Sequence, residues 1–180
     1  MSDHLNGLSP GWVWARLGEI VVLINGDRGK NYPSKGAFVA EGVPFINAGH
    51  LADGAVDLST MNYITLERFD ILGGGKVQDG DLLYCLRGSL GKAAVVRNIE
   101  RGSIASSLVI LRAPSNLPVE YLFYVLQSPH GAAEVKRYDN GSAQPNLAAK
   151  SVARFSIPLP PLNEQKRIVA KIEALQERST

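Results

Sequence analysis

The chain has 180 residues and a mass of 19.4 kDa, of which 45% are hydrophobic and 20% charged, as is typical of a folded domain and not of a disordered chain. Nineteen basic and 17 acidic residues give a net charge of +2, too small to identify a partner, and the single cysteine, Cys85, excludes intrachain disulfides and cysteine-based zinc clusters. The chain opens without a basic leader and apolar core, and no run approaches the roughly 18 apolar residues of a membrane span, so we expect a soluble, cytoplasmic domain.

Short runs rich in β-branched and aromatic residues predict strands through the first two-thirds of the chain. The runs are residues 12–17, 19–24, 43–47, 81–86, 93–97 and 107–112. Pro44 restricts its run to an edge strand or a first strand position, because proline has no N–H to donate to a neighbouring strand. The last three runs are expected in one sheet. In total, the sequence predicts about five to seven strands.

Helical periodicity begins only in the last third of the chain. In order, we expect a helix over 118–127, a second helix over 129–138, a polar loop over 139–150, an extended proline-rich segment over 156–162 and a helix from Asn163 onward. The predicted fold class is therefore α+β, with a β-rich body and few helices.

Charge is unevenly distributed along the chain. Residues 37–81 carry two basic and seven acidic side chains, whereas residues 82–180 carry thirteen basic and seven acidic ones. Such a chain could present one positive face to a polyanion, or folding could intermix the charges.

The sequence contains no motif for a common catalytic or cofactor chemistry. Neither a phosphate-binding G-x-x-x-x-G-K-[ST] loop nor a dinucleotide-binding G-x-G-x-x-G is present. The three histidines, His4, His50 and His130, lie far apart without metal-ligand spacing, so we expect them to be structural or solvated. Glu134 and Lys136 match half of a metal-dependent nuclease motif, but a three-residue match of this kind is common by chance.

Two polar loops carry the side chains best suited to binding. Residues 26–36 combine several long hydrogen-bond donors, and residues 87–92 place cations among glycines that allow close backbone approach to a ligand. The donors are Arg28, Lys30, Asn31, Tyr32 and Lys35 in the first loop and Arg87, Ser89 and Lys92 in the second. Such residues can bind phosphates or base edges. By themselves, they leave DNA, RNA and an acidic protein open as partners.

A motif in the last 40 residues carries a resemblance to a known family. Residues 141–147 read GSAQPNL, and residues 157–169 read IPLPPLNEQKRIV. Together they closely resemble the specificity (S) subunits of type I restriction–modification systems, in which G-[ST]-x-Q-x-N-L precedes I-P-x-P-P-x-x-E-Q-x-x-I at the start of a helix. Blocks near residues 14–20, 42–46 and 80–83 are also similar to that family, although less specific.

The resemblance implies a target-recognition domain that reads one half of a split DNA site, over residues 1–158, and a conserved helix over 159–180 for dimerisation or methyltransferase contact. Full-length S subunits contain two such domains and two helices, so the chain resembles a half-length S subunit. We therefore expect a homodimer that reads an interrupted palindrome. The expected seam consists of Ile168, Val169, Ile172 and Leu175.

The resemblance also implies that the chain is not an enzyme and holds no cofactor. S-adenosylmethionine, ATP and Mg are expected only in the modification (M) and restriction (R) subunits, which together with double-stranded DNA are the expected partners, without membrane association. The expected DNA-binding residues are Arg28, Lys30, Asn31, Lys35, Arg87, Ser89, Lys92, Gln144, Asn146 and Lys150. For the last three, the family motif leaves contact with DNA, contact with the methyltransferase and bracing of the domain against its helix open, and bracing is the expected role of Asn146 if its neighbour Leu147 packs in the core.

Two other functions stay open on the sequence. One is a small metal-dependent nuclease that uses Glu134 and Lys136 with carboxylates such as Asp79 and Asp81. The other is a truncated fragment without DNA affinity that only binds a modification subunit.

Overall fold

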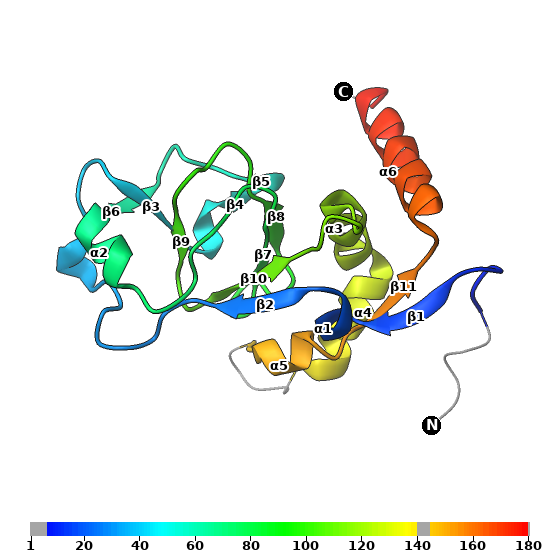
Figure 1. The fold of residues 1–180 in the computed structure, drawn as a ribbon, viewed down its shortest axis with the longest axis horizontal. Helices are drawn as coiled ribbons and strands as arrows, with labels where there is room; N and C mark the ends of the chain where they lie inside the picture. Colours follow the sequence, from blue (N-terminus) through cyan, green and yellow to red (C-terminus); the bar gives the residue numbers. More distant parts are fainter. Residues whose placement is uncertain (1–6, 140–144, 180) are drawn as a thin grey trace.

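A computed structural model describes residues 7–139 and 145–179, and it confirms the α+β class. The strands are β1 (Val13–Arg16), β2 (Val22–Asn25), β3 (Val43–Ile46), β4 (Leu51–Ala52), β5 (Gly54–Val56), β6 (Asn62–Ile64), β7 (Leu82–Cys85), β8 (Ala93–Val95), β9 (Ser103–Ile104), β10 (Leu108–Arg112) and β11 (Ser156–Leu159). The α-helices are α1 (Leu17–Ile20), α2 (Leu66–Ile71), α3 (Val119–Gln127), α4 (Pro129–Tyr138), α5 (Ala149–Val152) and α6 (Leu162–Glu177). Figure 1 shows α2 and β6 at one end of the molecule and α6 at the other.

The centre of the body is a six-stranded sheet in the order β2-β10-β7-β8-β5-β4. Its middle strands β7 and β10 are apolar, apart from the final Arg112 of β10, because both faces of the sheet are covered. Leu82 and Tyr84 of β7 face one hydrophobic cluster, and the alternate residues Leu83 and Cys85 face another. The first cluster is covered by α3, and the second lies towards the three-stranded sheet β6-β3-β9. The prediction that runs 81–86, 93–97 and 107–112 share one sheet is confirmed.

The prediction of one strand over residues 19–24 is wrong in its first half. Residues Leu17–Ile20 form the short helix α1, and β2 begins only at Val22. The Glu19 Oε2 atom accepts a hydrogen bond from the Arg16 backbone N–H at 3.0 Å. This bond satisfies a free donor at the helix start. A local capping interaction therefore outweighs the β-propensity of the run.

The prediction for Pro44 is also wrong. Pro44 is the second residue of β3, which lies between β6 and β9 in the middle of its sheet. It pairs with Tyr63 of β6, whereas pairing with β9 begins only at Phe45. Pro44 therefore lies where the central strand has a single paired neighbour, so its missing N–H leaves no partner unsatisfied.

The structure contains short elements that the sequence patterns do not reveal. The described residues form eleven strands, against the five to seven predicted, and the additional ones are two- and three-residue strands such as β4, β5 and β9. Helix α5 lies at the end of the segment that was predicted to be a polar loop. These elements are too short to show a hydrophobic period. β5 and β9 pair with the distant strands β8 and β3, and β4 pairs with β5.

A buried ion pair joins two neighbouring strands of the six-stranded sheet. Asp81 lies immediately before β7 and is 2% exposed. Its two carboxylate oxygens accept hydrogen bonds from Nε and Nη2 of Arg112, the last residue of β10, both at 2.8 Å. The Gln78 backbone N–H donates to the same carboxylate at 2.7 Å. The pair therefore fixes the turn before β7 against the end of β10.

The helical side of the body is tied to the C-terminal segment through Tyr121 of α3. Its side chain is 2% exposed, and its hydroxyl donates to the Pro158 carbonyl of β11 at 2.6 Å. Burial raises the pKa of Tyr121 from 10.0 to about 12. The neutral phenol is therefore the form that the folded protein accommodates.

This shift predicts that stability falls as the pH rises from 10 to 12, because the unfolded chain loses the Tyr121 proton first. Below pH 10 the folded and the unfolded chain both keep the Tyr121 proton, so the stability that the raised pKa provides is fully present. Urea unfolding measured at several pH values should show a smaller loss across this interval for Tyr121→Phe than for the parent chain. An equal loss in both proteins would contradict the assignment.

Helix α6 follows β11 and contacts α3 along its length: near its C-terminal end, Gln176 Oε1 accepts a hydrogen bond from the Tyr124 hydroxyl at 3.1 Å. Ile168 and Val169 are half-buried and pack against the cluster beneath α3, whereas Leu175 is 50% exposed. The domain boundary expected after residue 158 falls within β11, which pairs with β1. No helix in the ranges 7–139 and 145–179 is long and apolar enough to cross a membrane.

Candidate nucleic-acid interface

Three segments that the sequence marks as polar and basic meet around one cavity of about 470 Å³. Arg28 follows β2, Arg87 follows β7, and Asn146 and Lys150 come from the segment that ends in α5. The four residues are exposed, and none of the nine residues that line the cavity is acidic. The fold thus gathers cations from positions up to 122 residues apart into one concave surface.

Backbone hydrogen bonds connect two sides of this cavity. The Leu147 N–H donates to the Leu86 carbonyl at 2.8 Å, and the Gly88 N–H donates to the Pro145 carbonyl at 3.4 Å. Arg87 and Asn146 are thereby antiparallel bridge partners. Leu147 is 1% exposed and packs in the core, which anchors the bridge. Asn146 thus has a fixed backbone and an exposed side chain.

Hydrogen bonds of the Asp27 and Arg28 side chains fix the loop on the third side of the cavity. The Asp27 carboxylate accepts from the N–H groups of Gly73 at 2.7 Å and Gly29 at 2.6 Å, and these bonds lower the pKa of Asp27. Asp27 therefore remains charged and joins the loop to a distant turn. Arg28 Nη2 donates to the Ser106 carbonyl at 3.3 Å, which ties this side chain to the segment between β9 and β10.

Gly26 lines the cavity, and the backbone of Ile104 and Ala105 lies too close to it for any residue with a Cβ atom. A Cβ atom there would lie 2.8 Å from the Ile104 carbonyl oxygen and 2.9 Å from that of Ala105. Neither backbone atom can move aside easily, so only glycine allows the chain after β2 to pass this close to Ile104 and Ala105.

The other predicted residues of the first loop lie outside the cavity. Lys30 and Lys35 are exposed. Asn31 is half-buried, and its Nδ2 donates to the Ile71 carbonyl at 2.9 Å. Its amide thus holds the loop against α2. Tyr32 also has a structural contact, an edge-on ring contact with Phe45 at 5.6 Å.

Ser89 and Lys92 line a separate hollow of about 440 Å³ between the turn after β7 and the helices α3 and α4. Lys92 Nζ donates to the Ala48 carbonyl at 3.3 Å. The 87–92 turn therefore presents Arg87 to one hollow and Ser89 and Lys92 to another. Gln144 lies outside the described residues.

Asn25 also lines the cavity, and the sequence patterns do not single it out as a binding residue. It is the last residue of β2 and directly precedes the glycine at the floor. The signal that could have identified it is this Asn-Gly pair at a strand end, a position where polar side chains commonly meet a ligand.

The carboxylates of the nuclease alternative have structural partners. Glu134 is 6% exposed and accepts from the Ser156 N–H at 2.7 Å, and Asp79 accepts from the Asn98 N–H at 2.8 Å. Asp81 belongs to the pair with Arg112. In residues 7–139 and 145–179, no group of three or more His, Cys, Asp or Glu side chains could hold a metal ion. Nothing in this geometry supports a nuclease.

The described histidines have structural partners as well. His50 is 4% exposed, its Nδ1 accepts from the Asn47 N–H at 3.1 Å, and its Nε2 lies 3.2 Å from the Thr60 carbonyl. His130 Nε2 lies 2.6 Å from the Ser156 carbonyl. His4 lies outside the described residues.

Comparisons with known proteins point to one family. The specificity subunit of the type I restriction enzyme EcoBI of Escherichia coli is 26% identical over 138 residues, which are 76% of this chain and 29% of that subunit. The MjaVIII specificity subunit of Methanocaldococcus jannaschii is 21% identical over 170 residues, 91% of this chain and 39% of that subunit. The chain thus spans less than half the length of these relatives.

Solved structures agree. The HsdS subunit of Thermoanaerobacter tengcongensis superimposes with a TM-score of 0.73 at 25% identity, over 98% of this chain and 40% of that one. A chain from a structural study of the assembly of a type I R-M system gives 0.75 at 25% identity, over 98% of this chain and 41% of that one. The family model described as the type I restriction modification DNA specificity domain matches residues 10–180. This protein therefore belongs to the family of type I restriction–modification DNA specificity domains.

Proposed function

We propose that this chain reads one half of a bipartite DNA target for a type I restriction–modification system and positions the methyltransferase and restriction subunits on it. The observation that carries the proposal is the cavity into which Arg28, Arg87 and Lys150 converge without an acidic neighbour in its lining. A concave surface with clustered cations favours a polyanion.

The cavity residues divide into two roles. Arginine and lysine neutralise phosphates and position the protein, and bidentate side-chain contacts with base edges distinguish sequences by roughly 1–3 kcal/mol each. Asn146 projects from a fixed backbone and is suited to an adenine edge. Lys30 and Lys35 extend the basic surface along the exposed loop. Asn31 is assigned a structural role instead, because its amide is already bound to Ile71.

The covalent steps are assigned to the partner subunits. Methyl transfer would use S-adenosylmethionine in the modification subunit, and ATP-driven steps with Mg would occur in the restriction subunit. This division is supported by the names of the relatives, which are specificity subunits. The chain itself would supply sequence discrimination.

The experiment that tests the proposal is selection from a random duplex library with this chain and its methyltransferase. We expect enrichment of one short motif, repeated in inverted orientation at a fixed spacing if two copies act together. Replacing Asn146 with alanine should relax the preference at one base position without abolishing binding. Recovery of unselected sequences at low salt, despite tight binding to the methyltransferase, would favour the DNA-inactive fragment.

Two copies are proposed to pair through α6, along the side that carries Ile168, Ile172 and Leu175. The exposed Leu175 supports the proposal, whereas Ile168 and Val169 also contact their own domain. Sedimentation at tens of micromolar should show a dimer that Leu175→Glu converts to monomer, because a charge at a helical seam is costly to bury. Leu66→Glu, at an equally exposed leucine of α2, is the matched control. A parent chain that sediments only as monomer would refute the pairing.

A further inference from the structure

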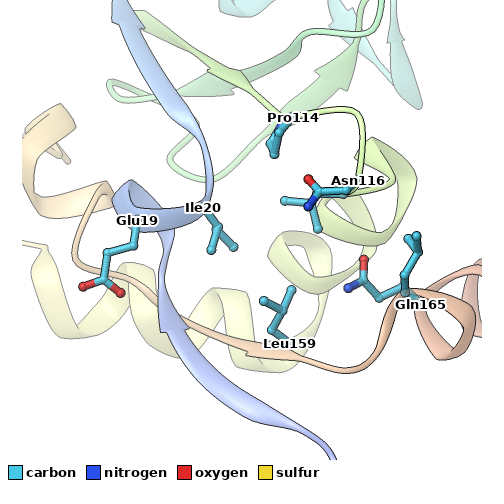
Figure 2. A pocket seen from close by; sticks show the side chains of 8 residues that line it. Glu19, Ile20, Pro114, Asn116, Leu159 and Gln165 are labelled. Atoms are coloured by element: carbon cyan, nitrogen blue, oxygen red, sulfur yellow. The ribbon is translucent and has the colours of Figure 1, made fainter.

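Two other hollows offer a polyanion no free cation among the described residues that line them. The hollow of about 430 Å³ at the start of α6 has Glu19 and no lysine or arginine in its lining, and Figure 2 shows the apolar side chain of Leu159 facing it. The hollow beside Ser89 contains Lys92, whose Nζ already donates to the Ala48 carbonyl at 3.3 Å. A DNA backbone that leaves the basic cavity therefore gains little in either hollow.

The surface formed by α4 and α5 is different, because it carries two arginines on one aromatic ring. The two helices lie side by side (Figure 1). The guanidinium carbons of Arg137 and Arg154 each lie 5.5 Å from the centroid of the Tyr138 ring. A cation over an aromatic face is attracted by the quadrupole of the ring. Tyr138 therefore holds both positive charges in one small region of the surface.

The ring itself is fixed by the core. Tyr138 stacks on Phe155, with ring centroids 5.7 Å apart and an interplanar angle of 23°, and Phe155 is fully buried. The Tyr138 hydroxyl donates to the Arg154 carbonyl at 3.4 Å, which joins the end of α4 to the segment after α5. Arginines held on a rigid ring lose less side-chain freedom on binding a ligand than unsupported arginines do.

The hydrogen-bond donors of both guanidiniums are unused. Within the described part of the chain, neither the Arg137 nor the Arg154 side chain donates a hydrogen bond, and both are exposed. Glu134 Oε1 lies 3.5 Å from Arg137 Nη1, but Glu134 is 6% exposed and its Oε2 accepts from the Ser156 N–H at 2.7 Å. This carboxylate offsets part of one charge and leaves the outward donors open. Planar forks of unused N–H groups suit phosphate oxygens.

The two arginines continue the basic surface of the cavity. Lys150 of α5 lines the cavity, and Arg154 follows it by four residues. The helical turn persists to that point, because the Arg154 N–H donates to the Ser151 carbonyl at 3.0 Å. Residues four apart lie on the same side of a helix. This continuity favours duplex DNA over an acidic protein, since one sugar–phosphate backbone can contact both the cavity and the two arginines.

We propose that Arg137 and Arg154 form an arginine clamp that binds the DNA backbone next to the stretch held in the cavity. The proposal rests on the proposed DNA function and extends it, because the clamp adds phosphate contacts that position the duplex and carry no sequence information. Since Glu134 offsets part of the charge of Arg137, the clamp is equivalent to between one and two phosphate contacts.

The first test replaces both clamp arginines, Arg137 and Arg154, with alanine. Fluorescence anisotropy with a duplex should show affinity lower by about ten- to sixtyfold at 0.1 M salt and a salt slope smaller in magnitude by about 0.9 to 1.8, while the sequence motif selected from a random library stays the same. The control replaces two exposed cations elsewhere, Arg101 and Lys166, and has the same net charge. It should retain nearly all of the parental affinity.

The outcomes separate the clamp from the proposed DNA function. If the parent chain binds DNA and the clamp variant binds it as tightly, or if the control loses as much affinity, the clamp is refuted and the cavity proposal stands. If the parent chain binds no duplex at low salt, both proposals fail. Unchanged DNA affinity together with weaker binding to the methyltransferase would overturn the clamp in favour of a contact with an acidic protein.

The carboxylate of Glu134 provides a second test, in the opposite direction. Glu134→Gln keeps an oxygen that can accept from the Ser156 N–H but removes the negative charge beside Arg137. We expect DNA to bind about two- to fivefold more tightly at low salt, because the clamp then has a larger positive charge. In an Arg137→Ala background the same substitution should give almost no gain. An equal gain in both backgrounds, or no gain in a folded Glu134→Gln variant, would contradict the role of Arg137.

Discussion

Alanine substitution of Arg28, Arg87 and Lys150 together is expected to reduce affinity for duplex DNA about 500-fold at 0.1 M salt. Each phosphate contact contributes a slope of about −0.9 to the dependence of log K on log salt, which at 0.1 M corresponds to a factor of about 8 per contact. The three side chains line one cavity without an acidic residue, so their contributions are expected to act on the same stretch of DNA backbone. Fluorescence anisotropy across a salt series measures both quantities.

The slope of log K against log salt distinguishes the loss of three phosphate contacts from a general effect of lower net charge. The triple variant should have a slope smaller in magnitude by about 2.7, that is, by three contacts. A control variant replaces three exposed cations outside the cavity, Arg101, Lys136 and Lys166, with alanine and has the same net charge. If both variants lose affinity equally, the cavity is not the phosphate-binding surface.

Replacing Arg112 with methionine is expected to destabilise the fold by about 3–5 kcal/mol, because it leaves the carboxylate of Asp81 buried without its counter-charge. The Gln78 N–H would be the remaining donor to that carboxylate. The substitution also removes the hydrogen bond from Arg112 Nη2 to the Lys76 carbonyl, at 3.1 Å. Urea unfolding followed by circular dichroism measures the change.

The pair between Arg97 and Glu120 provides the matched control, since its side chains are 46% and 35% exposed, whereas the Asp81 side chain is 2% exposed. Arg97→Met should cost less than about 1 kcal/mol. The double variant Asp81→Asn, Arg112→Met should recover part of the loss, because it removes the uncompensated charge. A loss for Arg112→Met no larger than that for Arg97→Met would contradict the assignment of a buried pair.

The long elements of the fold were predictable, because each has enough residues to show its own pattern. The apolar runs of β7 and β10 and the helical periods of α3, α4 and α6 are visible in the sequence. The short strands β5 and β9 are not, because they pair with strands far along the chain, β8 and β3. Pro44 was misassigned for a related reason. A proline fits in the middle strand β3 because pairing between β3 and β9 begins only at the next residue, Phe45.

The candidate site was predictable in residue type and only partly in role. Side-chain chemistry identified Arg28 and Arg87, the family motif marked Asn146, and the structure brings the three to one cavity. The same chemistry also selected Asn31, whose amide is bound to the backbone of Ile71. Donors that read a ligand and donors that brace a loop are alike in sequence, and only tertiary contacts distinguish them.

The loop that carries Lys30 and Lys35 is anchored by a small hydrophobic cluster of its own. Tyr32 and Phe38 pack with Phe45 in a small cluster separate from the two clusters on either side of the central sheet. The solvent-facing positions can consequently be exchanged by grafting while these anchors stay in place. Chimaeras that transplant only the outward-facing side chains should retain the parental melting temperature, so that new target preferences can arise without loss of foldability.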